Sequence, residues 1–284
     1  MDLIETYKKV DRKSECVMDA IFENMWDFEF VPTHAIARHC GISEEKVEPI
    51  LKRLASMKLV ENKYTEYIGS SFTFKGLSVY SLKRLVRRNV IDMLGKLMGE
   101  GKESVVFNCF SERYGELVLK LHRVGYPSFK KVKEKRDYGT LHYTVLTVRS
   151  AKREFTALKR LYGSISVPKP IAWEGNAVVM ELIDARELYK VRLENPEEIL
   201  EMIIEEIKKM YEAGIVHGDL SQFNILVSEE GLWIIDFPQS VDVNDEKADD
   251  YLIRDIENVL SYFERSYGVK KNLNEVLEYV KGKT

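Results

Sequence analysis

The stretch from residue 217 to residue 239 constrains the fold most, because it spaces three polar side chains around two short apolar runs. A polar loop, His-Gly-Asp-Leu-Ser-Gln-Phe-Asn, precedes these runs, which we expect to pair as a hairpin. Asp219 and Asn224 lie on the loop, and Asp236 directly follows the second run. Phosphoryl transfer from a nucleotide needs one carboxylate to orient the attacking hydroxyl, and an amide oxygen and a second carboxylate to hold a metal ion. The spacing therefore predicts a phosphoryl-transfer site.

Two further motifs precede this stretch and would complete a nucleotide site. Gly99 and Gly101 belong to the sequence Gly-Glu-Gly-Lys-Glu-Ser, whose glycines would let backbone N–H groups approach phosphates closely. Lys120 ends an apolar strand, where it could pair with phosphate oxygens and be held by Glu154 on the following helix. Each motif alone is weakly specific, since glycine turns and surface lysines are common. Their order ahead of the polar loop makes the combination specific.

The first 76 residues read as short helices followed by a strand pair. Apolar spacing predicts helices over residues 14–27, 33–40 and 43–57, with a tight turn at Gly41 between the last two. Strands are predicted over 59–68 and 71–74 around a turn at Gly69-Ser70, and Gly76 is expected to end the unit. This order is typical of a winged helix-turn-helix.

Charge is distributed unevenly along the chain. Residues 1–160 contain 30 Lys and Arg against 21 Asp and Glu, whereas residues 161–284 contain 13 against 25. Residues 77–98 are predicted to form a linking helix that carries four cations on one side: Lys83, Arg84, Arg87 and Arg88. A basic first part and an acidic second part indicate one face for a polyanion and another that repels it.

Composition places the chain among ordinary globular proteins, with 45% apolar and 31% charged residues. No apolar run approaches the roughly 18 residues of a membrane helix, and the charged N-terminus lacks the apolar core of a signal peptide. The three cysteines (Cys16, Cys40 and Cys109) are widely spaced and form no Cys-x-x-Cys motif. We therefore expect no disulfide framework, no cysteine-rich zinc site and a reducing, cytoplasmic location.

Together these motifs resemble the protein-kinase superfamily, and specifically the atypical RIO kinases. Gly-Glu-Gly-Lys-Glu-Ser at 99–104 resembles that family's nucleotide loop, and the loop at 217–224 resembles its catalytic loop. Asp-Phe-Pro-Gln at 236–239 resembles its metal-binding loop, and a winged helix ahead of a reduced kinase domain resembles the type 2 branch. The resemblance implies an α+β fold, an N-terminal winged helix-turn-helix followed by a minimal two-lobed kinase-like domain. The implied boundaries are 1–76 for the winged helix, 77–98 for the linking helix, 99–180 for the kinase N-lobe and 181–284 for the reduced C-lobe.

The resemblance also assigns roles to single residues. Asp219 would be the catalytic aspartate, and Asn224 and Asp236 would bind Mg²⁺ or Mn²⁺. Lys120 would bind the α- and β-phosphates of ATP and pair with Glu154. The residues implied to cover the phosphates are Gly99, Gly101, Lys102, Glu103 and Ser104. Met180 would be the gatekeeper, and the Glu181 carbonyl and Ile183 N–H would bind adenine.

Departures from an ordinary kinase limit the implied activity. Gly218 replaces the arginine that reads a phosphorylated activation loop, and Pro238 replaces a glycine, which makes a large flip of this segment harder. Only 48 residues follow Asp236, too few for an activation segment and the helices that hold peptide substrates. Two reactions stay open: transfer to a serine or threonine hydroxyl oriented by Asp219, or ATP hydrolysis through a phosphorylated carboxylate, for which RIO relatives suggest Asp236. His217 is expected to brace the loop.

A long basic stretch separates Lys120 from Glu154, and we expect a mobile loop over about 125–147. Ser128 is the candidate autophosphorylation site on it, with Thr140 and Thr144 as competitors. The alternative is a solvated charged face.

The family implies a partner rich in RNA, the maturing small ribosomal subunit. The cations of the linking helix and of residues 130–136 fit contact with RNA phosphates. Glu44, Glu45 and Glu48 open the predicted recognition helix beside Lys46, Lys52, Arg53 and Lys58, so we do not expect sequence-specific DNA binding. We expect a monomer in solution and no membrane association. The alternatives are an ATP-gated RNA- or ribosome-binding scaffold and a small-molecule phosphotransferase, although the latter needs a helical substrate domain after Asp236.

Overall fold

The computed structural model describes residues 3–64, 67–123 and 143–282. They form two compact units, one comprising Met1–Lys152 and Ala172–Val179, the other Arg153–Ile171 and Met180–Thr284. Most of the loop expected over 125–147, including Ser128, Thr140 and the cations at 130–136, lies outside the described residues. In the described part of the chain, no helix is long and apolar enough to cross a membrane.

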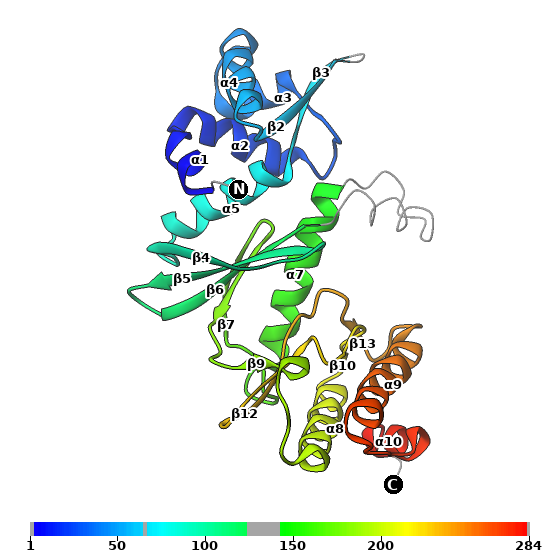
Figure 1. Ribbon diagram of the computed structural model, residues 1–284. Helices are drawn as coiled ribbons and strands as arrows, with labels where there is room; N and C mark the ends of the chain where they lie inside the picture. The colour runs from blue at the N-terminus through cyan, green and yellow to red at the C-terminus, as the bar shows by residue number, and fades with distance from the viewer. Residues whose placement is uncertain (1–2, 65–66, 124–142, 283–284) are drawn as a thin grey trace. The chain divides into compact units, whose positions relative to one another are not determined.

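The first unit begins with the predicted winged helix-turn-helix (Figure 1). Its elements are α1 (Leu3–Lys9), α2 (Arg12–Asn24), β1 (Val31–Pro32), α3 (Thr33–Cys40), α4 (Glu44–Ser56), β2 (Val60–Tyr64) and β3 (Ile68–Phe72). The strands form an antiparallel sheet in the order β1-β3-β2. Gly41, with φ of 63°, makes the predicted turn between α3 and α4 in the left-handed region that glycine adopts without strain. Apolar side chains of α2, α3 and α4 form the core, among them Val17, Ile36 and Leu54.

The wing turns at a different place from the predicted one. Gly69-Ser70 lies inside β3, paired with β2, and does not form the turn. A Cβ on Gly69 would lie 2.8 Å from the Cβ of Phe30 and 2.9 Å from its carbonyl oxygen. Gly69 is therefore needed because another chain segment packs closely against it. The sequence pattern alone does not distinguish such a glycine from one that forms a turn.

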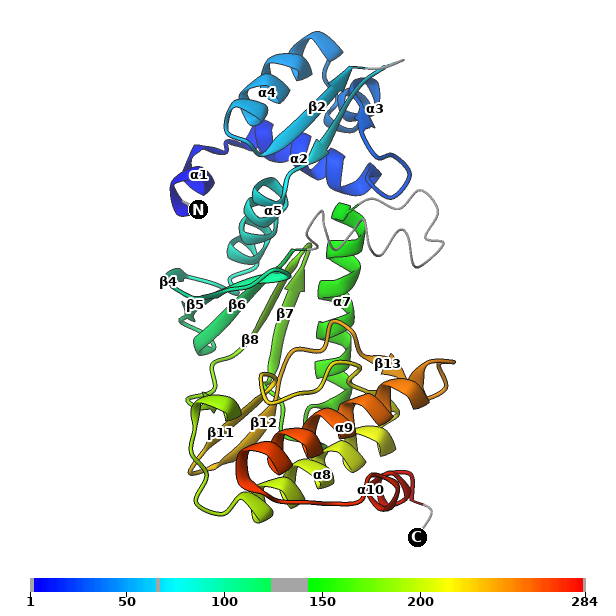
Figure 2. The same cartoon turned by 45° about the vertical axis from the view of Figure 1, so that its right-hand side comes forward.

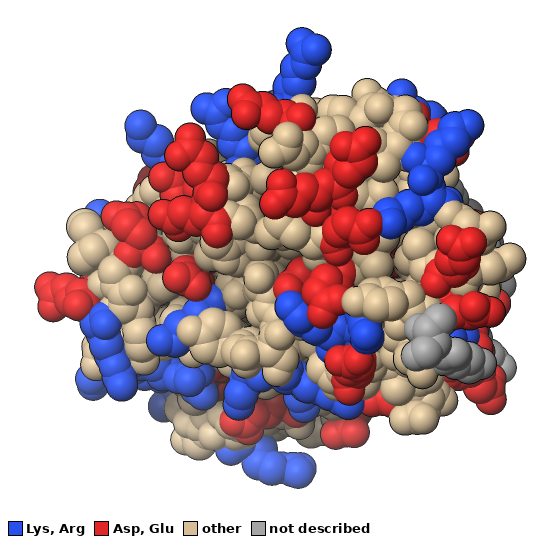
Figure 3. Space-filling view, turned by 90° about the horizontal axis from the view of Figure 1, so that it is seen from below, with Lys and Arg blue, Asp and Glu red and all other residues tan. Residues whose placement is uncertain are grey.

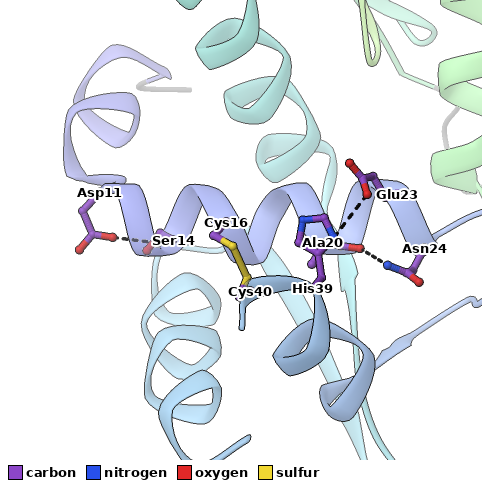
Figure 4. The surroundings of a disulfide bond; sticks show 8 residues. All are labelled: Asp11, Ser14, Cys16, Ala20, Glu23, Asn24, His39 and Cys40. Carbon is purple, nitrogen blue, oxygen red and sulfur yellow. Dashed lines mark hydrogen bonds and ion pairs between the residues drawn. A yellow bond between two sulfur atoms is a disulfide. The ribbon is translucent and has the colours of Figure 1, made fainter. Parts of the chain in front are cut away.

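A disulfide bond joins Cys16 and Cys40, which corrects the expectation that the cysteines stay apart. Cys16 lies on α2 and Cys40 is the last residue of α3, and their Cα atoms are 5.9 Å apart (Figure 4). His39 Nδ1 lies 3.3 Å from a carboxylate oxygen of Glu23, which adds a second link between the same helices. Packing of α2 against α3 brings together cysteines that are 24 residues apart, a separation that carries no motif. Cys109 is free and buried.

The predicted linking helix is shorter than residues 77–98. Helix α5 covers Phe74–Arg87, and Asn89, with φ of 54°, turns the chain after it. Thr73 caps its start by accepting a hydrogen bond from the N–H of Gly76, so this glycine begins a helix instead of ending the winged helix. Residues Met93–Glu100 form a strand, β4, and not the end of a helix.

A five-stranded sheet follows α5 in the same unit (Figure 2). Its strands are β4, β5 (Ser104–Ser111), β6 (Gly115–His122), β7 (Pro170–Glu174) and β8 (Ala177–Glu181), in the order β4-β5-β6-β8-β7. Asn176, fully buried between β7 and β8, donates from Nδ2 to Ser78 Oγ at 3.2 Å and to the His122 carbonyl oxygen at 2.9 Å. Its Oδ1 accepts from Ser81 Oγ at 2.9 Å, so the network fixes α5 to the sheet.

The four cations predicted on one side of the linking helix lie on α5 and pair with carboxylates of the same unit. We call Lys83, Arg84, Arg87 and Arg88 the α5 cation stripe. Glu15 of α2 contacts Lys83, at 3.0 Å, and Arg87. Glu174 of β7 contacts Arg84 at 3.4 Å and Arg88 at 3.0 Å. The stripe therefore links α5 to α2 and to the sheet, and its contact with RNA phosphates stays a prediction.

The second unit contains the remaining elements, and α7 (Tyr143–Leu161) contributes to both units. They are β9 (Arg186–Glu187), the short 3-10 helix η1 (Leu188–Lys190), α8 (Pro196–Glu212), β10 (Ile215–Val216), β11 (Ile225–Ser228), β12 (Gly231–Ile234), β13 (Val241–Asp242), α9 (Ala248–Tyr267) and α10 (Leu273–Val280). Asn195 is the N-cap of α8 and Pro196 its first residue, where a missing N–H costs no helical hydrogen bond. Helices α8, α9 and α10 pack together, and acidic side chains gather on the face in Figure 3. Because α7 begins earlier than expected, Thr144 is helical and 2% exposed, which removes it as an accessible phosphorylation site.

Candidate active site

The polar loop predicted to carry catalysis begins directly after β10 and is braced by His217. This imidazole is fully buried and contacts the Phe237 ring at 4.7 Å. Its Nδ1 accepts from the backbone N–H of Asp219 at 3.3 Å, so Nε2 carries the proton and donates to the Ile235 carbonyl oxygen at 3.0 Å. Both nitrogens are engaged with the backbone. His217 therefore holds the loop, as expected, and is not positioned to transfer a proton.

Gly218 has the left-handed φ of 81°, and its surroundings leave no space for a side chain. A Cβ at this position would lie 2.7 Å from the Gln239 carbonyl oxygen. The arginine of an ordinary kinase loop is therefore sterically excluded here, in addition to the backbone strain that any side chain would bring. The loop packs directly on the segment that follows Asp236.

Asp255 on α9 supports the loop, although no sequence motif marked it as a site residue. It is 1% exposed, and its two carboxylate oxygens accept from the backbone N–H groups of Gly218 at 2.7 Å and Leu220 at 2.8 Å. Burial raises the pKa of Asp255 to about 6, although the two N–H bonds act in the opposite direction. The sequence did offer a signal that could have identified Asp255: an acidic residue on the apolar face of a helix, between Leu252 and Val259. Neighbouring Arg254 donates to the Gly218 carbonyl oxygen.

Asp219, the predicted catalytic residue, presents its carboxylate at the surface of the second unit. Its Oδ2 accepts from Gln239 Nε2 at 3.2 Å, a contact that the sequence motifs did not predict. Partial burial raises the pKa of Asp219, Arg254 opposes the shift, and the Asp236 carboxylate reinforces it. The raised pKa makes this carboxylate a better proton acceptor than an ordinary aspartate.

The two predicted metal ligands lie at neighbouring ends of β11 and β12. Asn224 Nδ2 donates to the Asp219 carbonyl oxygen at 2.7 Å, which leaves the amide oxygen to face a cation. The N–H of Ile235 donates to the Asn224 carbonyl oxygen at 2.9 Å, so Asp236 is adjacent to Asn224 across the hairpin. Asp236 adopts the left-handed φ of 74°, which is uncommon outside glycine and frequent at functional sites. An amide oxygen and a carboxylate fit the oxygen ligands that Mg²⁺ prefers.

The segment after Asp236 is rigidly held. Phe237 is fully buried, and its carbonyl oxygen accepts from both the N–H and the Oγ of Ser240, at 3.2 and 2.8 Å. The Pro238 carbonyl oxygen accepts from Arg153 of α7 at 3.2 Å. These contacts fix Gln239 beside Asp219. Among the described residues, no group of three His, Cys, Asp or Glu side chains could hold a metal ion, and metal binding by Asn224 and Asp236 stays a prediction.

The predicted phosphate-covering residues lie in the first unit, at the turn between β4 and β5. A Cβ on Gly99 would meet nothing within 4 Å, and one on Gly101 only the Ser104 carbonyl oxygen at 3.8 Å. The fold itself therefore does not require these glycines. Arg123 anchors the turn through the Gly101 carbonyl oxygen at 2.6 Å and the Glu100 carboxylate at 3.2 Å. Lys102 and Glu103 are exposed and Ser104 is half-buried.

Lys120 and Glu154 are both almost completely buried, with exposed fractions of 7% and 1%. Lys120 lies on β6 in the first unit, opposite Val106 of β5, and Glu154 lies on α7 in the second unit. Because the two residues belong to different units, their ion pair stays a prediction.

The predicted adenine-binding residues lie at the end of β8 and directly after it, in the second unit. Met180 is 7% exposed, as a gatekeeper position requires, whereas Glu181 is exposed and Ile183 is half-buried. The Glu181 backbone N–H donates to the Lys169 carbonyl oxygen at 3.0 Å, which fixes the start of this segment. Their contacts with adenine stay a prediction.

Comparison with known proteins identifies the family. The family model "RIO domain" matches residues 105–276, and "Rio2, N-terminal" matches residues 7–88. The RIO-type serine/threonine-protein kinase Rio2 of Methanocaldococcus jannaschii is 35% identical over 268 residues, covering 89% of this chain and 98% of its own length. Rio2 of Schizosaccharomyces pombe is 33% identical, covering 85% of this chain and 73% of its own. The chain spans about half (49%) of the Dictyostelium discoideum relative, at 32% identity.

A solved structure resembles nearly the whole chain. The Rio2 kinase–ADP/Mg²⁺–phosphoaspartate complex from Chaetomium thermophilum superposes with a TM-score of 0.81 at 28% identity, covering 96% of this chain and 87% of that one. The predicted fold class, a winged helix-turn-helix followed by a reduced kinase domain, is confirmed. The chain belongs to the RIO family of serine/threonine protein kinases, in the branch that carries the Rio2 N-terminal domain.

Proposed function

We propose that the chain binds ATP with Mg²⁺ or Mn²⁺ and transfers the γ-phosphoryl group to a serine or threonine hydroxyl of a protein. The observation that carries this proposal is the arrangement of Asp219, Asn224 and Asp236 on one loop and hairpin, with the Asn224 amide held by the Asp219 carbonyl oxygen. This hydrogen bond uses the Nδ2 of Asn224 and leaves its amide oxygen available to a metal ion. The relatives' names and the ADP/Mg²⁺ complex of the Chaetomium relative support the choice of nucleotide and metal.

Each residue has a role in this reaction. Asn224 Oδ1 and the Asp236 carboxylate would hold the metal ion, which supplies charge neutralisation at the phosphates when bound. Asp219 orients the acceptor hydroxyl and takes its proton as the new P–O bond forms and the bond to ADP breaks. Gln239 keeps one oxygen of Asp219 occupied, so the other one faces the hydroxyl. Lys120, paired with Glu154, would bind the α- and β-phosphates beneath the Gly99–Ser104 turn, and residues 180–183 would bind adenine.

A second reaction shares the same site. The Chaetomium relative was solved as a phosphoaspartate complex. We infer that Asp236 can accept the phosphoryl group in this chain, after which water attacks phosphorus and releases phosphate.

The test is an incubation of the full chain with γ-labelled ATP and Mg²⁺, with Asp219→Asn and Asp236→Asn as test variants and the exposed Asp249→Asn as control. We expect acid-stable label on serine or threonine in the wild type and the control, reduced about 10³-fold in Asp219→Asn. A hydroxylamine-labile adduct and free phosphate, both lost in Asp236→Asn, would identify the hydrolytic reaction. Tight ATP binding without label or phosphate release would overturn both reactions and favour a scaffold.

We further propose that the protein acts in maturation of the small ribosomal subunit, as its resemblance to the RIO kinases implies. Because the cations of the α5 cation stripe are partly engaged with Glu15 and Glu174, RNA phosphates would also contact exposed cations of α4 and the wing, such as Lys46, Lys52 and Lys63. Co-sedimentation with small-subunit precursors should fall in a Lys46→Glu/Lys63→Glu variant and decrease steeply with salt. Unchanged sedimentation in that variant would overturn this docking site.

A further inference from the structure

Two large aromatic side chains lie together at the surface beside the candidate active site. Tyr189 of η1 is 45% exposed and Phe223 of the polar loop is 55% exposed. Their ring centroids are 4.8 Å apart in a tilted arrangement. A phenylalanine gains free energy from burial, so an aromatic contact left half in solvent offers apolar area for a partner.

The sheet places these rings together without burying them. In the antiparallel pairing of β9 with β11, Leu226 is opposite Glu187 and Val227 is opposite Arg186. Phe223 lies three residues before Leu226. If the same antiparallel register is continued that far beyond the sheet, Phe223 lies beside η1. The Phe223 N–H donates to Ser221 Oγ at 3.4 Å, so the turn is held by its backbone and not by the ring. Neither ring is needed for the core, since both remain about half exposed.

The position of the pair relates it to the acceptor. Phe223 immediately precedes the metal-ligand candidate Asn224 and follows Asp219 by four residues. A protein segment bound on the exposed rings would therefore lie next to the carboxylate that orients the acceptor hydroxyl.

The chemistry of the pair selects an apolar partner. The cation nearest the Tyr189 ring, Lys190 at 5.3 Å, is paired with Glu187 at 2.8 Å, so the immediate surface is close to neutral. Residues 161–284, with 13 basic against 25 acidic side chains, disfavour a polyanion. A protein segment with an apolar side chain fits this surface better than nucleic acid, whose bases could also stack on the rings.

We propose that Tyr189 and Phe223 form a docking surface for an apolar side chain that flanks the phosphoacceptor serine or threonine in a protein substrate. This proposal rests on the proposed kinase function. The rings would bury the flanking side chain and thereby bring the hydroxyl to Asp219. They touch the substrate and not the phosphates, so they determine which acceptor is phosphorylated.

The test uses Ala/Gly decapeptides with one serine and one variable residue (Phe, Leu, Arg or Glu) at each position from three before to three after the serine. Transfer from γ-labelled ATP is measured as KM and kcat for the wild type, Tyr189→Ser, Phe223→Ser and a control variant. The control is Tyr162→Ser, which removes a ring of similar exposure, 47%, elsewhere in the second unit. ATP turnover without peptide and binding of a uridine decanucleotide are measured in parallel.

We expect the wild type to prefer Phe and Leu peptides at one or two positions, about fivefold to tenfold in kcat/KM over Arg and Glu peptides. Tyr189→Ser and Phe223→Ser should each abolish this preference through KM, and Tyr162→Ser should retain it. If the wild type showed no preference among the peptides, or transferred phosphate to none of them, the docking surface would be overturned. ATP turnover in the same experiment would keep the kinase proposal intact. A parallel fall in ATP turnover would assign the rings to the nucleotide site, and loss of uridine-oligomer binding alone in Phe223→Ser would assign them to RNA. An inactive wild type, without ATP turnover, would count against the kinase function itself.

Discussion

The polar loop at 217–224 and the α5 cation stripe both stand out in the sequence, but they differ in how far along the chain their hydrogen-bond partners lie. In the loop, Asp219 and Asn224 are five residues apart and are tied by a direct hydrogen bond of 2.7 Å. In the stripe, Lys83 lies 3.0 Å from Glu15, a residue that is 68 positions away in the chain. Local partners can be inferred from spacing, whereas distant ones cannot. A row of like charges therefore predicts a charged face but does not reveal whether the protein itself neutralises it.

The first way to sharpen this comparison is to break a distant link in the winged helix. Reducing the Cys16–Cys40 disulfide, or the change Cys40→Ser, should lower the free energy of unfolding by about 3 kcal/mol, because the closed loop restricts the unfolded chain. Calorimetry with and without dithiothreitol measures this loss of stability. The Cys109→Ser change, at a free buried cysteine, is the control for thiol chemistry. An equal melting temperature in both redox states would contradict the expectation.

The second test concerns Asp255, a distant support of the otherwise local loop. Its pKa of about 6 lies above the ordinary value of 3.8, so the native state binds the proton more tightly. The contribution of this group to stability is fully present below pH 3.8 and is lost as pH rises through 6. Between pH 4 and 7, wild-type stability should therefore fall relative to Asp255→Asn by on the order of 2 kcal/mol.

Thermal unfolding at several pH values measures this difference, with Asp249→Asn as the matched exposed control on the same helix. Parallel pH profiles for the wild type and Asp255→Asn would show that Asp255 does not titrate in this range. The Asp255→Asn change should also lower ATP turnover, because one of the two carboxylate oxygens that accept from the N–H groups of Gly218 and Leu220 is replaced by an NH₂ group.

The third test strains the loop where it meets the segment after Asp236. Gly218→Ala should lower the free energy of unfolding by about 2 kcal/mol. The φ of 81° disfavours a side chain, and the Cβ would come too close to the Gln239 carbonyl oxygen. Gly268→Ala is the matched control, with φ of 73° and nothing within 4 Å of the added Cβ. Urea unfolding should show a smaller loss for the control, and equal losses would mean that the contact has no effect.

The smallest expected effect comes from the stripe itself. Glu15→Gln should lower the free energy of unfolding by about 1 kcal/mol, because the carboxylate is half-buried and pairs with Lys83 and Arg87. Glu5→Gln, which alters an exposed pair with Lys9, should stay within about 0.5 kcal/mol of the wild type. A stability loss in Glu5→Gln as large as that in Glu15→Gln would contradict the assignment of the stripe to internal packing.

The sequence by itself determined local features of the second unit. Asn195 and Pro196 begin α8, and Gly214, with φ of 80°, follows its end. Asp219 and Asn224 share one loop, and Asp236 follows the hairpin of β11 and β12, whereas the catalytic roles of these residues stay predictions. Such features depend on short-range backbone geometry, which residue spacing encodes.

Only the tertiary structure decided which segments approach one another. Packing of α2 on α3 joined Cys16 to Cys40, the approach of Phe30 made Gly69 a strand residue, and α9 placed Asp255 beneath the loop. It also paired the α5 cation stripe with Glu15 and Glu174 and left Tyr189 and Phe223 in contact at the surface. In each case the partners are far apart in the chain, and their contact depends on helix and sheet packing that no local spacing encodes.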